Sequence, residues 1–392
     1  HLRLQASRLE LEVSIKNLLR GLIQIKSVSL REGALLLANY TPLTPEEEMG
    51  LPPVLDSVEM STRFTNTLLE KNTRLEITDL DIEIRHHVKN KLFKFRVDEI
   101  TSDVEFTDES IRSRTHMDVY IDTLGFNLAK GSFVNGEQAT GDLFLGFDLP
   151  KRQLDIEAFP LQLGDQVFET SAILNFMGAG TFDIVLDNQQ TRFAAAMDLL
   201  TENISQKFAA IDLESPLYTR TKLEGRFVYR DNPRVQVDFR TEDNMLVVDR
   251  EKRFQDIDFA GQFVNRVYVD STAKEDVKNF RIQIPQLNGN YKDLAFQIED
   301  LVLASSPDAE NAFSARIRAS GSPESLNNFV EDQHWSFEEG HFEMTSAIDG
   351  EGLEAGSIIS SSKGQFTLEN TRIINNDNKV GLPVKHIALS IG

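Results

Sequence analysis

The sequence predicts a mostly β protein built from antiparallel strands. Apolar and polar residues alternate with a period of two over much of the 392 residues, which is the pattern of a strand with one apolar and one solvated face. Gly, Asn, Asp or Pro separates each alternating stretch from the next, as expected for turns. Stretches with helical spacing are few. We therefore expect a protein that presents a long apolar surface along its strands.

The alternation is clearest in four stretches spread along the chain, at residues 9–15, 93–98, 313–320 and 341–348. In each, apolar residues occupy every second position, except at Ser346 in the last stretch, and mostly charged or hydroxyl residues lie between them. Because neighbouring side chains of a strand point to opposite faces, each stretch predicts a strand with a continuous apolar face.

The clearest hairpin spans residues 223–241. Apolar residues alternate over 223–229 and again over 235–241, and Asp231-Asn232-Pro233 lies between the two stretches. These three residue types favour a turn, and Pro233 is unsuited to a central strand position. We expect two antiparallel strands joined at this turn.

Two helices are predicted. Apolar residues recur at steps of three and four over about 190–211. A second helix, 322–331, begins at Ser322-Pro323, which are suited to the cap and the first turn. No long Ser, Gly or Pro run divides the chain, so we expect one continuous architecture with the first part of a β-sheet over 1–189, an amphipathic helix over 190–212, and a continuation of the sheet over 213–392.

The composition excludes several classes of function. The net charge of −21, without a compensating cluster of Lys and Arg, disfavours nucleic-acid binding. The absence of cysteine removes thiol catalysis, disulfides and zinc–thiolate sites. The 26 Phe residues against six Tyr and one Trp suit a dry core or a surface for alkyl chains.

The chain begins with His1 and ends within an alternating pattern, so we expect a fragment trimmed at both ends.

The search for catalytic chemistry gives no positive signal. No Gly-rich phosphate loop or nucleophile elbow is present, and the seven histidines lack metal-ligand spacing. Asp79, Asp81 and Glu83 alternate as a solvated strand face would, without the Gly-containing loop of a calcium site. We expect no enzymatic activity, no catalytic or metal-ligating residues and no cofactor.

One segment resembles a known family. Residues 9–37, LELEVSIKNLLRGLIQIKSVSLREGALLL, are similar to the N-terminal signature of AsmA-like proteins, in which an alternating strand is followed by a short turn and a strand pair. The turn corresponds to Leu18-Leu19-Arg20-Gly21. The strand-pair positions of the signature are occupied here by Ile23, Ile25, Val28, Leu30, Gly33, Leu35 and Leu37. The later order of helix, hairpin and strands is also similar to the central part of this family.

The resemblance to AsmA-like and TamB-like proteins implies a fold and a function. It implies an elongated, curled antiparallel sheet with an apolar concave groove, in a periplasmic protein that is anchored to the inner membrane by an N-terminal helix preceding this chain. It implies binding or conduction of phospholipid acyl chains between inner and outer membrane, support of outer-membrane assembly, and other envelope proteins as partners. The residues that we expect to line the groove are Leu11, Val13, Ile15, Ile25, Phe93, Phe95, Phe227, Val237, Phe239, Phe313 and Phe342.

Two alternatives share the same periodicity. A structural or adhesive β-sandwich or solenoid would pack its apolar faces against each other in a closed core. A carbohydrate-active enzyme would use some of the 62 acidic residues. The sequence does not decide between an open groove and a closed core.

Overall fold

The fold is described from a computed structural model. It describes residues 2–14, 17, 24–39, 69–86, 90–125, 128, 131–178, 180–199, 202–206, 209–226, 233–265, 280–292, 294–305, 312–328, 334–351 and 362–391. Twenty strands are assigned to one sheet, and helices are short and few among the described residues. The predicted mostly β class, with a largely antiparallel sheet that does not close, is therefore confirmed.

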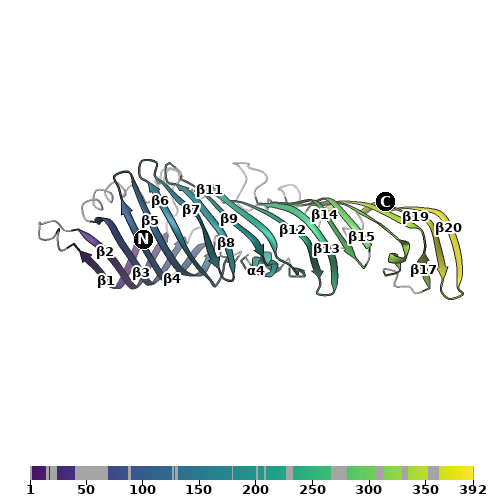
Figure 1. Cartoon of the computed structure of the whole chain (residues 1–392), viewed down its shortest axis with the longest axis horizontal. Helices are drawn as coiled ribbons and strands as arrows, with labels where there is room; N and C mark the ends of the chain where they lie inside the picture. The colour runs from purple at the N-terminus through teal and green to yellow at the C-terminus, as the bar shows by residue number, and fades with distance from the viewer. Residues whose placement is uncertain are drawn as a thin grey trace. The chain divides into compact units, whose positions relative to one another are not determined.

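The chain divides into two compact units, which are described separately. Unit 1 comprises residues 1–209 and 220–234. Its strands follow one another in chain order (Figure 1). They are β1 (Leu2–Val13), β2 (Ile25–Asn39), β3 (Leu69–His86), β4 (Lys91–Phe106), β5 (Ser110–Gly125), β6 (Glu137–Asp148), β7 (Gln153–Leu163), β8 (Gln166–Asn175), β9 (Thr181–Thr191) and most of β11 (Leu217–Arg226).

Unit 2 comprises residues 210–219 and 235–392. Most of its strands also pair with neighbours in the sequence, but β10 pairs with β12, β16 with β18 and β17 with β19. They are β10 (Ile211–Leu213), β12 (Arg234–Val248), β13 (Lys252–Val264), β14 (Phe280–Tyr291), β15 (Leu294–Ser305), β16 (Ala312–Gly321), β17 (Trp335–Glu338), β18 (His341–Glu351), β19 (Ser362–Asn375) and β20 (Val380–Ile391).

Among the strand pairs whose register the structure describes, one departs from the antiparallel pattern. β2 and β3 are parallel, with Leu35 opposite Ile82. Parallel neighbours cannot be joined by a tight hairpin and need a longer connection. The 29 residues numbered 40–68, which separate these strands, lie outside the described residues.

The predicted helix over 190–211 is wrong as a single element. β9 continues to Thr191, and two short helices follow, α4 (Phe193–Asp198) and α5 (Glu202–Ser205), before β10 begins at Ile211. Part of the predicted span is helical in α4, but apolar spacing alone does not separate one long helix from two short ones. The segment predicted at 322–331 is a 3₁₀ helix, η4 (Pro323–Asn328), and its last three residues lie outside the described part.

Several strands contain a residue with left-handed backbone, and most of these residues are acidic. They are Glu32, Asp79, Asp243, Asp256, Asp300 and Asn370, with φ between 48° and 55°. Asp and Asn tolerate this conformation better than β-branched residues do. Asp243, Asp256 and Asp300 coincide with shifts of the strand register. Such irregularities bend a strand and increase its twist, so they account physically for local curvature of the sheet.

Candidate functional site

The apolar side chains of β2 to β5 form rows across unit 1. Phe95 lies opposite Ile82 of β3 and opposite Ile121 of β5, and Leu35 of β2 lies opposite Ile82. Directly opposed residues share one face of a sheet, so these four side chains form one row. Parallel rows pass through Phe93 and Val97. We call this surface the β1–β5 apolar face, made up of Leu9, Leu11, Leu30, Leu35, Ile77, Leu80, Ile82, Ile84, Phe93, Phe95, Val97, Ile100, Met117, Val119 and Ile121.

Burial on the β1–β5 apolar face falls toward its outer strand. Val97 and Leu80, in the central row, are 1% and 4% exposed. Phe93 and Phe95 are half-buried. Leu9 and Leu11 of β1 are 61% and 52% exposed. Within the residues that the structure describes, all strands belong to one sheet, so no separate sheet covers this face.

Unit 2 has a comparable row. Val237 lies opposite Phe263, and the row continues through β14 and β15 to Phe313 of β16. Two residues predicted from sequence, Val237 and Phe313, thus lie in one row although 76 positions separate them (313 − 237). Phe239 lies beside Gly261, where a Cβ atom would come within 2.5 Å of the Phe239 ring. The glycine makes room for the aromatic ring.

The remaining predicted residues occupy different environments. Leu11 is exposed at the outer strand, whereas Val13 and Ile25 lie opposite each other and are half-buried. Phe342 is only 1% exposed and stacks on Phe366 with ring centroids 6.0 Å apart. Ile15 and Phe227 lie outside the described residues.

Two packed clusters close parts of the apolar surface. In unit 1, Ala139, Leu163 and Phe168 pack with partly buried residues that include Leu199, just after α4. In unit 2, Ala319, Phe342 and Leu368 pack with Leu326 of η4, Phe337 of β17 and other residues. At these places short helical or loop segments cover the sheet, and the side chains belong to a core.

A strip of hydroxyl residues interrupts the apolar rows of unit 1. Ser102 lies opposite Thr115, and Thr73 and Ser113 flank Val104 in the next row. Thr73, Ser102 and Thr115 are buried, and Ser113 is half-buried. Sequence reasoning assigned Ser and Thr to the solvated face and missed this strip. The sequence does contain a signal for it. Arg112, Arg114 and His116 alternate with Ser113 and Thr115, which places the two hydroxyl residues on the face opposite to the basic side chains.

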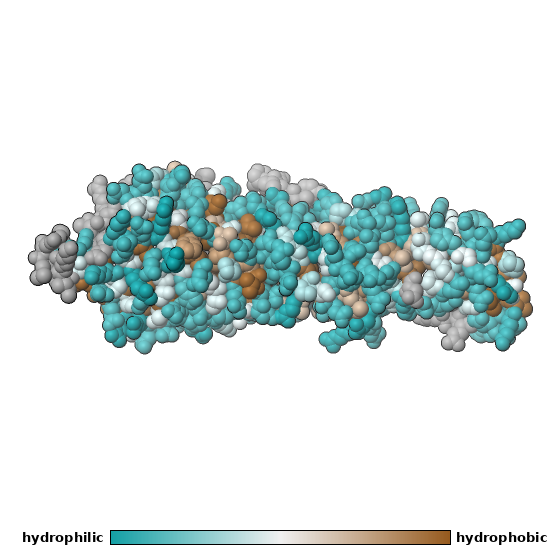
Figure 2. All heavy atoms as spheres, viewed as in Figure 1, coloured by the Kyte–Doolittle hydropathy of each residue, from teal (hydrophilic) through white to brown (hydrophobic). Residues whose placement is uncertain are grey.

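The opposite side of the strands carries charged and amide side chains. Figure 2 shows one view of the molecule, which is largely hydrophilic with a few apolar patches over β6 to β9. Exposed Phe144, Val167 and Ile173 belong to these strands. The Arg114 guanidinium lies 4.9 Å from the centre of the Phe144 ring, so the two side chains make a cation–π contact.

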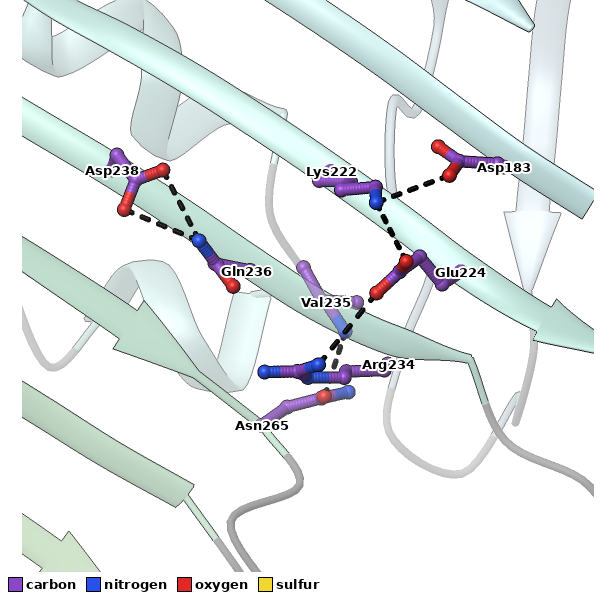
Figure 3. Close-up of polar contacts among 8 residues, drawn as sticks. All are labelled: Asp183, Lys222, Glu224, Arg234, Val235, Gln236, Asp238 and Asn265. Atoms are coloured by element: carbon purple, nitrogen blue, oxygen red, sulfur yellow. Dashed lines mark hydrogen bonds and ion pairs between the residues drawn. The ribbon is translucent and has the colours of Figure 1, made fainter. Parts of the chain in front are cut away.

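Polar contacts connect neighbouring strands within each unit. In unit 1, the Lys222 ammonium lies 2.6 Å from Glu224 and 3.1 Å from Asp183 (Figure 3). The hydrogen bond to Glu224 and then that to Asp183 raise the pKa of Lys222. In unit 2, the backbone N–H of Val235 donates to the Asn265 side chain at 2.8 Å (Figure 3). These contacts connect neighbouring strands, and we assign them a structural role.

A polar depression of about 750 Å³ lies on unit 1. Its lining includes Asp165, Glu169, Asp187 and Arg220, and the Arg220 guanidinium is 3.9 Å from Asp187. The side chains of Glu169 and Val167 alternate with buried Phe168 and Thr170, so the depression lies on the face opposite to the apolar rows. It is distinct from the predicted groove residues.

Known proteins give no further guide. Comparisons with protein-family models, curated proteins and solved structures found no match. Across the described ranges, no helix is long and apolar enough to cross a membrane, and no group of three or more His, Asp or Glu residues is placed to hold a metal ion. The apolar rows are therefore the candidate site that the described geometry supports best.

Proposed function

We propose that this chain binds the acyl chains of lipids along the β1–β5 apolar face and along the corresponding row of unit 2. The observation that carries the proposal is the partial burial of Phe93 and Phe95 in rows that no separate sheet covers among the described residues. A sheet face of this kind either packs against another element or receives an apolar ligand.

The expected selectivity follows from the residues of the rows. Leu, Ile, Val and Phe offer no hydrogen-bond partner to a head group, so binding scales with the apolar area removed from water. Each buried methylene contributes about 0.8 kcal/mol. We therefore propose that the site selects for alkyl chains, with phospholipids as the ligand class.

The cellular role rests on the resemblance of residues 9–37 to AsmA-like proteins. We propose a non-enzymatic role in the periplasm, in a protein anchored to the inner membrane, in which acyl chains are bound or conducted between the inner and outer membranes. The proposed role supports outer-membrane assembly, with the two membranes and other envelope proteins as partners.

A second candidate function is a structural or interaction protein with a closed core. The packed cluster around Phe342, which is 1% exposed, favours this reading locally. In that case the half-buried Phe rows would complete a core, and substitution there would unfold the protein.

The two candidates predict different results for Phe95→Asp. Native mass spectrometry of gently purified protein should show bound phospholipid for the unsubstituted chain. The Phe95→Asp variant should lose most of it while keeping its far-UV circular dichroism. The matched control is Phe144→Asp, because Phe144 is an exposed aromatic of the opposite face, and this variant should keep its lipid. Absence of lipid in the unsubstituted protein, together with unfolding of Phe95→Asp, would favour the closed core.

A further inference from the structure

The hydroxyl strip of unit 1 has one more hydrogen-bond donor than its own hydrogen bonds use. Three of its hydroxyls form a chain, in which the Thr115 oxygen lies 2.8 Å from that of Ser102 and 3.1 Å from that of Ser113. The fourth, Thr73, donates to the backbone oxygen of Ile25. Three hydroxyls carry three hydrogens, and each hydrogen bond consumes one. Within the described part of the chain these three hydroxyls make only the two bonds, so one hydrogen is left for a further acceptor.

Ser113 is the hydroxyl of this chain that a ligand reaches most readily. Ser102 and Thr115 are each 7% exposed, whereas Ser113 is half-buried. A hydroxyl rotates to suit its partners, so Ser102 can donate to Thr115 and Thr115 to Ser113. The Ser113 hydrogen is then directed to the ligand. Hydrogen bonds in such a chain polarise one another, which strengthens the last donor.

The acceptor that suits this donor is uncharged. On the apolar face, Leu143 and Leu145 of β6 lie opposite the strip residues of β5. Arg112 and Arg114 alternate with Ser113, so their side chains project from the other face. A carboxylate or a phosphate at the strip would lose water without gaining a counter-ion, which is costly. A carbonyl oxygen accepts the same hydrogen bond and has no charge to compensate.

The strip lies close to one end of the strands. Ser113 is three residues from Ser110, where β5 begins after the connection from β4, a distance of about 10 Å along the strand. On the other side of the strip, successive rows through Ile100, Val97 and Phe95 are apolar. A lipid with its acyl chains on these rows has its head group toward the β4–β5 connection. Its ester groups, which join the acyl chains to glycerol, then lie at the strip.

We propose that the Ser113 hydroxyl donates a hydrogen bond to an ester carbonyl of a glycerolipid whose acyl chains occupy the β1–β5 apolar face. This inference rests on the proposed function and adds a ligand class to it. The apolar rows alone do not distinguish ester-linked from ether-linked lipids, because both bury the same length of alkyl chain. The hydroxyl strip distinguishes them, because an ether-linked lipid lacks the carbonyl. Ser113 is therefore a residue that determines specificity.

A competition between two lipids tests the ligand class in the full chain. The vesicles contain equal amounts of dioleoyl phosphatidylcholine and its dioleyl ether analogue, which differ only in the two carbonyl groups. After incubation, the protein is separated from the vesicles, and mass spectrometry gives the ratio of the two bound lipids. The unsubstituted protein should prefer the ester about fivefold, the effect of one net hydrogen bond.

Two variants of nearly equal side-chain shape separate the hydroxyl from packing. Ser113→Thr keeps the donor and should keep the ester preference. Ser113→Val lacks the donor and should bring the ratio of the bound lipids to about one. The matched control is Ser171→Val, because Ser171 is a half-buried serine of the opposite face, and this variant should keep the preference.

The outcomes separate this inference from the proposed function. Equal binding of the two lipids by the unsubstituted protein would overturn the inference alone, and this measurement requires no variant to fold. An ester preference that survives Ser113→Val would also overturn it. If neither lipid is recovered with the unsubstituted protein, the proposed function fails and the inference fails with it.

Discussion

The hydroxyl groups of Ser102 and Thr115 lie 2.8 Å apart, on adjacent strands, within the apolar rows of unit 1. Both side chains are buried, and Thr115 is also 3.1 Å from the Ser113 hydroxyl. A buried hydroxyl is tolerated when it is hydrogen-bonded and is costly when it is not. The strip therefore places a satisfied polar group on a face that is otherwise apolar.

Removing one partner of this hydroxyl pair should destabilise unit 1. Ser102→Ala leaves Thr115 with one fewer hydrogen bond in a buried site, at a cost of about 1–2 kcal/mol in the free energy of unfolding. The double variant Ser102→Ala/Thr115→Val should be less destabilised than the sum of the single variants, because both hydroxyls are gone. Urea unfolding measures the coupling. Additive effects would show that the two hydroxyls do not interact.

The backbone at Asp79 provides a test of the left-handed positions. Its φ is 55° and its side chain is exposed, so the conformation rather than packing restricts the residue. Asp79→Val should lower the free energy of unfolding by about 1–2 kcal/mol, since a β-branched residue is strained there. Asp79→Gly should be tolerated within about 0.5 kcal/mol, because glycine adopts this φ without steric cost. Equal losses in thermal unfolding for the two variants would contradict a left-handed residue.

Phe342 should behave as a core residue. It is 1% exposed and packs with Ala319, Leu368 and the partly buried residues around them. Phe342→Ala should cost about 3–5 kcal/mol through lost burial and the cavity left behind, whereas Phe342→Leu should cost less. Denaturant unfolding measures both. A loss below about 1 kcal/mol for Phe342→Ala would place this side chain outside a packed core.

The ionisation of Asp98 should make the free energy of unfolding depend on pH. The Arg96 guanidinium 2.9 Å away, and then the Gln138 amide, lower the pKa of this carboxyl. A carboxyl whose pKa is lower in the folded state stabilises the fold at pH above its unfolded pKa, and loses that contribution as pH falls through the folded pKa. Because the side chain is partly exposed, the effect should be about 1 kcal/mol or less.

The measurement for Asp98 is a comparison of unfolding free energies between pH 7 and acid. The unsubstituted protein should exceed Asp98→Asn at neutral pH, and the difference should shrink as the carboxyl becomes protonated. Asp103→Asn is a suitable control. Asp103 is an exposed carboxyl of the same strand, and the Arg74 guanidinium lies 3.9 Å from it. A pH-independent difference would indicate that Asp98 acts through packing.

Much of the strand content could be predicted from the alternation alone. Residues 93–98 and 313–320 lie in strands at the expected places, because a period of two is a local property that sequence displays directly. The prediction of one helix over 190–211 was wrong because a few apolar spacings suit either one long helix or two short ones. The strands β9 and β10 on either side limit the helical segment.

The alternation by itself determined which residues of a strand share a face, and hence the apolar character of the surface. Only the tertiary structure decided how that face is used. It placed Val237 and Phe313 in one row, enclosed Phe342 in a cluster with η4, and left Leu11 exposed at an outer strand. The physical reason is that burial depends on which elements pack over a face, and pairing between distant strands depends on left-handed residues and register shifts that the period of two does not reveal.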